Sequence, residues 1–483
     1  MFKKLFFIFI TCLSLSSFAQ YETITFTNSL KKTTTILKDA VPVVNQKNGD
    51  VSLFLIDSKK IYGYLFDSNF DIKQEISSEK RSRKYKKIIG YSISENNDYR
   101  LFLTTLKDDK FATINFSYDN NSSTLKELDL KLTNEAFLQT VVFDNTFHLI
   151  SIIKGTSILV LYTFNNAGGF EKNMIDLTNQ KFINRKDETT NLYKLLAGRN
   201  VEIHKIEENN PNAIELTSEY TKMYLRKNQV VFTIDENKNF TQIITIDLTA
   251  NSATVKQIEK PFLAVKKAIK KTNSYLFGDN IFMIAATSTQ LSFVIQDYKN
   301  GKQIKKYFVT SKDTISFKNT PIIQTGGYYD GYREMEKTKK FLRKITKDNI
   351  GVSVYQNQND YHITLGGNNT YSTGGGGGMM MMGGFGGVPL GSFGAVNVFM
   401  NPTFFAYDSY TNTKSTHITG LFDKNFNHLK GELQDNVFDK IDQFKDDFNT
   451  STNGETIFRY KDYYIYGHYT FSKKDYSLVL IKD

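Results

Sequence analysis

Histidine offers the widest choice of chemistry in this chain, because imidazole can transfer protons near neutral pH and bind metals. The six histidines are His148, His204, His362, His417, His428 and His468. None belongs to an HExxH motif or to a close pair with the spacing of metal ligands. His362 and His417 stand in similar strings, His-Ile-Thr-Leu-Gly and His-Ile-Thr-Gly, which predict neighbouring strands. Cross-strand pairing could bring the two rings together, but we interpret them as ordinary sheet residues.

Motifs for nucleophilic or phosphate chemistry are missing from the sequence. It contains no Gly-x-Ser-x-Gly elbow, no Gly-x-x-x-x-Gly-Lys-Ser/Thr loop and no EF-hand pattern. The single cysteine, Cys12, falls within a predicted signal peptide, so the mature chain has no disulfide, thiol nucleophile or cysteine-bound metal. We predict no cofactor and no metal site, assign no catalytic residue, and favour a non-enzymatic role.

The first 19 residues have the pattern of a signal peptide. Lys3 and Lys4 precede an apolar core, and Ser17-Phe18-Ala19 fits signal-peptidase cleavage. No later apolar run approaches the roughly 20 residues that a membrane helix needs. We therefore predict export without a transmembrane helix in the mature chain, to the periplasm, the outer membrane or the medium.

Basic residues give the chain a formal net charge of +11. Such an excess serves solubility, or it favours an acidic partner such as a protein, an acidic glycan or lipopolysaccharide. Nucleic acid is not expected, because the sequence has no recognition module and an exported protein seldom meets it. The candidate basic surface residues are Lys80, Arg81, Arg83, Lys84, Lys266, Lys267, Lys270, Arg343 and Lys344.

A Gly/Met-rich insertion covers residues 366–403. It includes Gly374–Gly378 and has no charged residue between Gly366 and Asn401. Glycine at this density loses too much backbone entropy to fold alone. We expect the insertion to dock on a protein partner or lipid, or to pack over its own domain; adjacent methionines without His or Cys are weak grounds for Cu(I). Its candidate contact residues are Met379, Met380, Met381, Met382 and Phe385.

A repeated unit must position all of these residues. Each unit has an apolar stretch, a turn rich in Asn, Asp or Gly, and further stretches of β-forming residues, which is the signature of antiparallel hairpins. The second strands of the units are expected to begin near Val51, Tyr99, Phe147, Val230, Ile281, Tyr361 and Tyr463. Three intervals between them are longer and hold expected helices near residues 191–197, 333–347 and 435–448. In the sixth unit we expect His428–Leu433 as the fourth strand.

This layout resembles β-propeller proteins across the mature chain, although Trp-Asp dipeptides and kelch motifs are missing. The last unit has three strands, and Tyr21–Phe26 is a lone strand that could complete it and close the ring. We predict an all-β fold, one seven-bladed propeller over residues 20–483 with helical and loop insertions. A duplicated sandwich or two smaller β domains is the alternative.

Architecture predicts activity poorly, because propellers serve many functions. We expect an exported, non-enzymatic scaffold for protein interaction in the cell envelope, with the basic residues and the Gly/Met-rich insertion on one face. The alternative is a glycan-binding or glycan-cleaving propeller that uses a carboxylate in its central channel and tyrosines.

Overall fold

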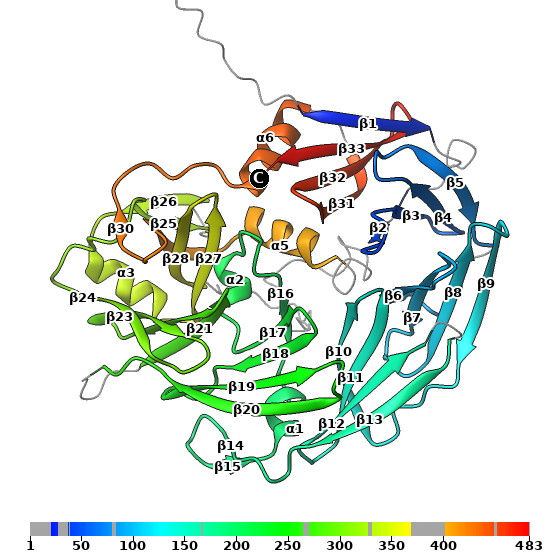
Figure 1. The fold of residues 1–483 in the computed structure, drawn as a ribbon. Helices are drawn as coiled ribbons and strands as arrows, with labels where there is room; N and C mark the ends of the chain where they lie inside the picture. The colour runs from blue at the N-terminus through cyan, green and yellow to red at the C-terminus, as the bar shows by residue number, and fades with distance from the viewer. Residues whose placement is uncertain are drawn as a thin grey trace, which may run out of the picture.

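A computed structural model shows a ring of seven β-sheets around a central channel (Figure 1). It describes residues 21–27, 37, 39–79, 84–165, 168–263, 270–326, 331–368, 401–448 and 452–482. The chain is a seven-bladed β-propeller, as the repeat predicts. The signal peptide and most of the Gly/Met-rich insertion lie outside the described residues.

Blades one to three are regular four-stranded antiparallel sheets. Blade one contains β2 (Asp39–Val44), β3 (Val51–Ile56), β4 (Ile61–Phe66) and β5 (Ile72–Ser77). Blade two contains β6 (Lys87–Ile93), β7 (Tyr99–Thr104), β8 (Phe111–Ser117) and β9 (Ser122–Leu128). Blade three contains β10 (Glu135–Phe143), β11 (Thr146–Ile153), β12 (Ile158–Phe164) and β13 (Phe170–Asp176). The predicted second strands of all three units are confirmed.

Blade four carries the first insertion. Its sheet contains β16 (His204–Ile206), β17 (Thr221–Arg226), β18 (Gln229–Ile234), β19 (Phe240–Asp247) and β20 (Ser252–Glu259). β16 pairs in parallel with β17 and adds a short strand on the channel side. The same insertion also contains β14 (Phe182–Ile183), β15 (Thr189–Thr190), α1 (Leu192–Leu196) and α2 (Ile214–Thr217). Blade five is regular, with β21 (Lys271–Phe277), β22 (Asn280–Ala286), β23 (Gln290–Asp297) and β24 (Gln303–Thr310).

Blade six differs from the prediction in its outer strand. Its sheet contains β27 (Ile350–Asn357), β28 (Asp360–Asn368), β29 (Ser415–Phe422), β25 (Ile322–Thr325) and β26 (Tyr332–Met335). The expected strand 428–433 is only β30 (His428–Leu429), because Gly431 adopts a positive φ of 145° and turns the chain away. The β25–β26 hairpin pairs with the other half of β29.

Two helices inserted near blade six, α3 (Thr338–Ile345) and α6 (Val437–Phe448), agree with the sequence-based prediction. A third helix, α5 (Pro402–Thr411), was not predicted. Phe341, Leu342 and Ile345 are fully buried and form one apolar side of α3. No helix among the described residues has both the length and the apolar character needed to cross a bilayer.

Blade seven is closed by the N-terminal strand, as predicted. It contains β31 (Thr452–Tyr460), β32 (Tyr463–Thr470), β33 (Asp475–Lys482) and β1 (Glu22–Thr27). β1 pairs antiparallel with β33 over its whole length. Phe26 of β1 packs on Tyr64 and Phe66 of blade one, with ring centroids 5.1 and 5.2 Å away. This strand therefore joins the last blade to the first.

The two apolar faces of the inner strands explain why blades stack. The inner strands are buried on both sides, so all six residues of β3 are buried, whereas β5 at the outer edge has mostly exposed residues. Buried apolar side chains form clusters between neighbouring blades, such as Phe54, Phe116 and Tyr99 between blades one and two. Burial on both faces is thus the rule for inner strands of this ring.

Candidate functional site

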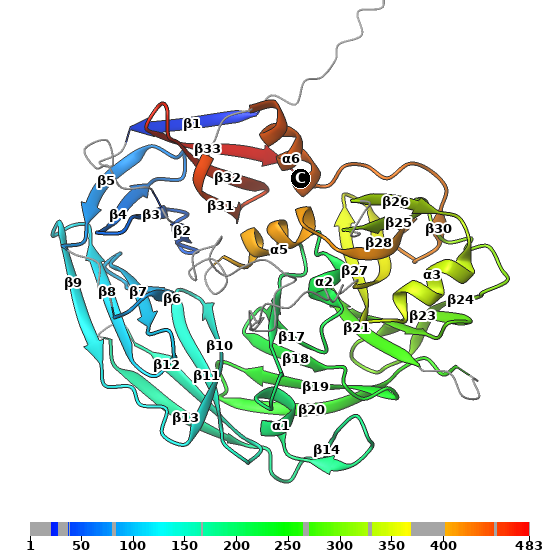
Figure 2. The same cartoon turned by 180° about the vertical axis from the view of Figure 1, so that it is seen from behind.

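The central channel is crossed by inserted segments. In both views of the fold, α5 lies inside the ring of blades (Figures 1 and 2), and β16 lies inside it in Figure 1. Thr403 of α5 donates a hydrogen bond to the Glu207 carboxylate at 2.6 Å. The Tyr464 hydroxyl of blade seven donates to the Asn209 carbonyl at 2.9 Å and to the Asn210 side chain at 3.1 Å. Insertions from blades four and six are therefore tied to each other and to blade seven.

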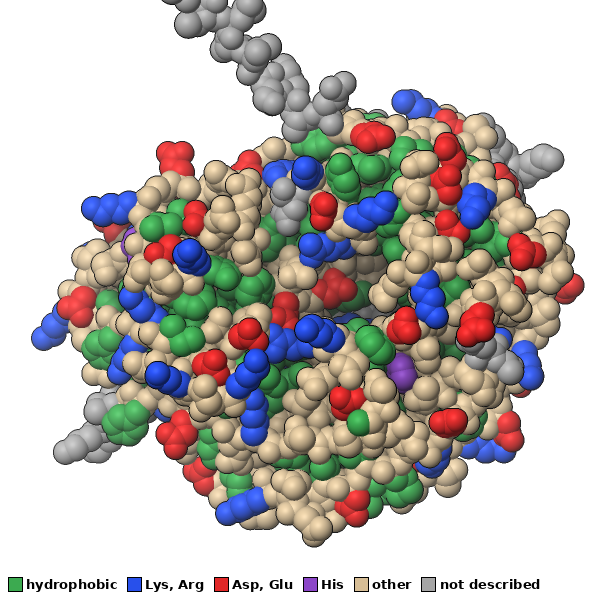
Figure 3. Space-filling model, viewed as in Figure 1, with side chains coloured by type: hydrophobic (Ala, Val, Ile, Leu, Met, Phe, Trp, Pro, Cys, Tyr) green, Lys and Arg blue, Asp and Glu red, His purple; other side chains and the backbone are tan. Residues whose placement is uncertain are grey.

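An ionisable cluster lies on the channel side of blade four. His204 Nε2 is 3.8 Å from a Glu202 carboxylate oxygen and 4.0 Å from one of Glu219. Burial raises the pKa of Glu219 to about 7 and lowers the pKa of His204 to about 4. Glu219 can therefore exchange a proton near neutral pH. The face of the molecule in Figure 3 has a hollow at its centre, with acidic and basic side chains around it.

Metal binding finds no support in these side chains. Among the described residues, no group of three or more His, Cys, Asp or Glu side chains is placed to hold an ion. The six histidines come from different blades or different strands.

The predicted basic surface residues are only partly described. Lys84 precedes β6 and forms a 2.7 Å ion pair with Glu127. Lys270 precedes β21 and is half-buried, and burial lowers its pKa. Both lie in connections that lead into the inner strand of a blade. The candidates outside the described residues are Lys80, Arg81, Arg83, Lys266, Lys267, Met379, Met380, Met381, Met382 and Phe385.

Arg343 and Lys344 belong to a crowded basic segment around α3. Lys339, Lys340 and Arg343 are exposed on this helix. Burial, and then the charges of Arg333, Lys347 and Lys340, lower the pKa of Lys344, so these cations lie close together. Among the described residues, no ion pair joins a Lys or Arg of residues 333–347 to a carboxylate. We call residues 333–347 the α3 basic segment.

The sheet of blade six has one apolar and one polar face. Val352, Val354, Ile363, Leu365 and Ile418 point to the core that it shares with blade five and α3. The alternate residues on the same three strands are polar. They are Ser353 and Tyr355 on β27, His362 and Thr364 on β28, and Ser415, His417 and Thr419 on β29.

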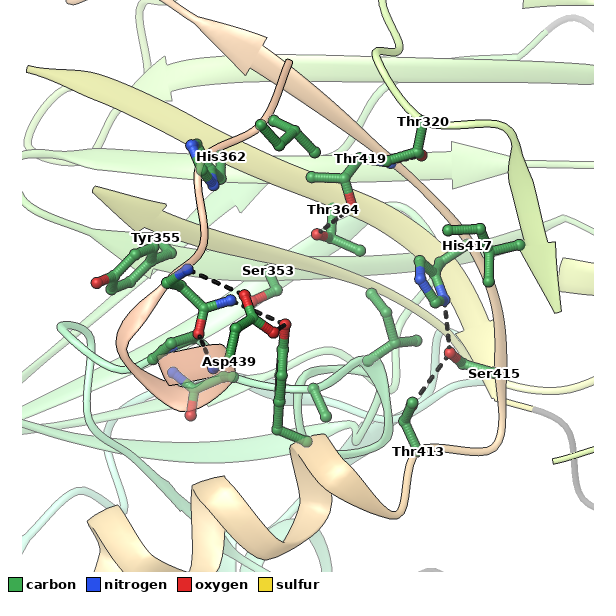
Figure 4. A pocket seen from close by; sticks show the side chains of 18 of the residues that line it. Thr320, Ser353, Tyr355, His362, Thr364, Thr413, Ser415, His417, Thr419 and Asp439 are labelled. Carbon is green, nitrogen blue, oxygen red and sulfur yellow. Dashed lines mark hydrogen bonds between the residues drawn. The ribbon is translucent and has the colours of Figure 1, made fainter. Parts of the chain in front are cut away.

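These polar side chains form rows across the strands (Figure 4). Ser353 pairs with Thr364, which pairs with Thr419, and the two threonine Oγ1 atoms are 2.9 Å apart. Tyr355 pairs with His362, with ring centroids 6.2 Å apart. The rows therefore place hydroxyl, imidazole and phenol groups side by side on one surface.

That surface forms one wall of a cavity of about 360 Å³. Opposite it lie the start of α6, Tyr410 of α5 and the residues that precede α2. The α5 and α6 helices lie between blades six and seven in Figure 1. The described lining is Pro211, Asn212, Ala213, Ile214, Thr320, Ile323, Thr325, Tyr332, Ser353, Tyr355, His362, Thr364, Tyr410, Thr413, Ser415, His417, Thr419, Leu433, Gln434, Asn436 and Asp439. We call this space the blade-six cavity.

The histidines of the cavity are uncharged, and its one described carboxylate is held by hydrogen bonds. Burial lowers the pKa of His417 to about 4 and also lowers that of His362, so both rings are uncharged at neutral pH. The Asp439 carboxylate accepts hydrogen bonds from the Asn436 backbone at 2.9 Å and from the Tyr410 hydroxyl at 2.8 Å. Asp439 is thereby engaged in capping α6.

Ser415 and His417 do not form a hydrolytic pair. Their Oγ and Nδ1 atoms are 2.9 Å apart, and Thr413 links Ser415 onward to Glu215. A base for serine needs a pKa nearer neutrality and a partner that orients its other nitrogen. Here the carboxylate, Glu215, is linked through Thr413 to Ser415 and not to the other nitrogen of His417. The hydrogen bonds therefore hold the strand and its polar surface in place.

His362 and His417 lie on neighbouring strands, as predicted. His417 pairs with Gly366 and His362 with Leu421, so the two are not cross-strand partners, which agrees with the interpretation preferred above. Both line the same cavity. The threonines between them were missed, although alternation of polar and apolar residues in both strings marks the polar face.

Comparisons with known proteins assign this chain to no family. No family model matches the sequence, and no curated protein matches it. The chain is similar to the Dos1 propeller at 9% identity and a TM-score of 0.33, over 95% of this chain and 94% of that chain. It is also similar to the Nup133 β-propeller domain of Vanderwaltozyma polyspora at 11% identity and a TM-score of 0.32, over 97% of this chain and 99% of that chain.

A dihydro-heme d1 dehydrogenase, NirN, in complex with DHE aligns at 8% identity and a TM-score of 0.25. The alignment covers 55% of this chain and 45% of that protein, so this chain spans less than half of its length. The fold assignment rests on the sheet topology above, and these likenesses assign no function.

Proposed function

We propose that this protein is an exported, non-enzymatic β-propeller that serves as an interaction scaffold in the cell envelope, and that the α3 basic segment docks an acidic protein partner. The single observation behind this proposal is the crowding of cations around α3 without a described carboxylate partner. Like charges held together cost free energy unless a partner of opposite charge meets them.

The sequence of α3 adds to this argument. The first turn holds Lys339 and Lys340 and no acidic residue. Positive charge at a helix N-terminus opposes the helix dipole, whereas Arg343 and Lys344 in the last turn agree with it. Helix stability therefore explains the last-turn cations but not those of the first turn. A docking role explains both.

Charge removal on α3 tests the scaffold. The triple variant Lys339→Gln, Lys340→Gln and Arg343→Gln should lose a partner that the wild-type protein retains from native membranes extracted in mild detergent. Binding of the wild type should weaken as ionic strength rises, because exposed charges are screened. A matched control, Lys302→Gln, Lys306→Gln and Lys312→Gln, removes the same charge from exposed positions of blade five and its exit loop. Equal recovery by both triple variants, or no identifiable partner of the wild type, would refute the proposal.

The alternative is a glycan-cleaving propeller, and one observation favours it. Glu219 has its pKa raised to about 7 beside Glu202 and His204, and an acid of that pKa suits proton donation to a leaving group. Hydrolysis in a polysaccharide panel by the wild-type protein, abolished by Glu219→Gln, would favour this alternative over the scaffold.

A further inference from the structure

The blade-six cavity is unusual in its setting. The inner strands of a propeller stack against neighbouring blades. In blade three, for example, β11 is buried along most of its length. In blade six, β27, β28 and β29 instead present hydroxyl and imidazole side chains to a space of about 360 Å³. Thr364, His417 and Thr419 are only half-buried, so their polar side chains are accessible to a ligand in this space.

The blade-six cavity is much larger than a site for a single structural water. A polar cavity that holds one structural water needs only about 15 Å³ of probe volume, whereas ligand pockets begin near about 300 Å³. The blade-six cavity lies in the second range. Its volume is that of a small ligand.

The lining selects the class of ligand. The described lining residues include no Lys or Arg, which disfavours phosphate and carboxylate ligands. Asp439, the single carboxylate of the lining, is already engaged by Asn436 and Tyr410. The remaining groups are hydroxyls, neutral imidazoles and amides, which both donate and accept hydrogen bonds.

Free hydrogen-bonding capacity remains in the polar rows. One of the two hydroxyls, of Thr364 or Thr419, donates its proton to the other. The second hydroxyl proton and the remaining lone pairs stay available to a ligand. His362 is 9% exposed, and no described group forms a hydrogen bond with its ring nitrogens. Tyr355 lies beside His362 and presents an aromatic ring to the same space.

We propose that the blade-six cavity binds a neutral sugar, as a free monosaccharide or as the terminal unit of a glycan. The ring hydroxyls of the sugar hydrogen bond to the Ser353, Thr364 and Thr419 row and to His362, and an apolar face of the ring packs on tyrosine. This site is distinct from the α3 basic segment, because α3 packs on the opposite, apolar face of the same sheet. It does not depend on the proposed scaffold function.

The probes are D-glucose, D-galactose, D-mannose and N-acetyl-D-glucosamine, with D-glucuronate as the charged comparison. Titration calorimetry and saturation-transfer NMR should show binding of at least one neutral sugar and weaker binding of glucuronate. The double variant Thr364→Val and Thr419→Val keeps the shape of the row and removes its hydroxyls. It should weaken binding by at least about tenfold, since each hydrogen bond contributes about 1 kcal/mol.

Thr113→Val is the matched control, because Thr113 is a buried strand threonine of blade two, far along the ring from the cavity. It should leave sugar affinity unchanged. Ser353→Leu fills the cavity instead of removing hydrogen bonds, so it tests the site if the double variant fails to fold. Absence of binding by every neutral sugar at millimolar concentration overturns the proposal, and so does binding that survives both the double variant and Ser353→Leu.

Discussion

Burial controls the charge of histidine throughout this molecule. It lowers the pKa of His148, His204, His417 and His468 to about 4. A neutral imidazole costs far less to bury than a charged one, and His148 needs only the Thr163 hydroxyl 3.1 Å away as its partner. The residues that first suggested proton or metal chemistry thus contribute mainly to packing and to neutral polar surfaces.

Acid should therefore destabilise the fold through these groups. A histidine with a folded pKa of about 4 and an unfolded pKa of about 6.5 binds more protons when unfolded, so its contribution is complete above pH 6.5 and is lost as pH falls toward 4. Between pH 7 and pH 5 each such histidine lowers the free energy of unfolding by about 2 kcal/mol. Glu219 acts in the opposite sense, because its folded pKa of about 7 favours the folded state at lower pH.

His148→Gln isolates one such group. The fall in unfolding free energy from pH 7 to pH 5 should be about 2 kcal/mol smaller in this variant than in the wild type. Urea unfolding at the two pH values measures it, and contributions from Glu219 cancel in the comparison. His428→Gln is the control, since His428 is only half-buried. An unchanged pH dependence in His148→Gln would mean that this ring is already protonated, or free to protonate, in the folded state.

At the scale of elements, local turn chemistry was predictable. The strings Leu-Phe-Asp-Ser-Asn-Phe at residues 65–70 and Leu-Phe-Asp-Lys-Asn-Phe at residues 421–426 differ at one position and form the same turn twice, at the end of β4 and of β29. In both turns the Asp side chain accepts a backbone N–H two residues later, at 2.9 and 2.8 Å. Phe70 and Phe426 then adopt positive φ angles of 65° and 59°. Contacts within a few residues produce this geometry, so the sequence alone indicates it.

Long-range placement could not be predicted from the same sequence. Strand β25 is four residues long and pairs with Thr416 and His417, which lie far along the chain. Lys222 and Lys260 resemble surface lysines in the sequence, yet both are fully buried at 2.9 and 3.0 Å from Asp235. The polar face of blade six resembles a solvent-facing strand, because alternation does not reveal that α5 and α6 cover it.

The closing strand gives the element-scale prediction. Phe26 is 7% exposed and contacts rings of both blade one and blade seven. Phe26→Ala should lower the free energy of unfolding by about 3 to 5 kcal/mol, through lost burial and a cavity between the blades. Equilibrium urea unfolding measures this change. Thr23→Ala, at an exposed position of the same strand, should cost no more than about 0.5 kcal/mol. Equal small effects would show that β1 contributes little to the fold.

At the scale of the whole molecule, the ring is closed by its two chain ends. β1 pairs with β33, and Thr25 and Ser477 hydroxyls meet at 3.0 Å across 452 residues of sequence. Blades one, two, three and five are built entirely from hairpins whose strands are neighbours in the chain. Local hairpins lose little loop entropy when they form, whereas closure between the ends loses much more. Closure should therefore follow the formation of the blades.

This order of events predicts how Phe26→Ala changes the kinetics. If the contacts of β1 are absent from the rate-limiting transition state, the variant should refold at the wild-type rate within about twofold and unfold about a hundredfold faster or more. Leu149→Ala, in the second strand of blade three, provides the comparison, because its buried contacts lie between blades two and three, away from the closing strand, and should form earlier. Stopped-flow refolding and unfolding in urea measure both rates. If the refolding rate of Phe26→Ala instead falls by the same factor as its equilibrium constant for folding, the β1 contacts form in the transition state. Closure of the ring would then precede the formation of the blades.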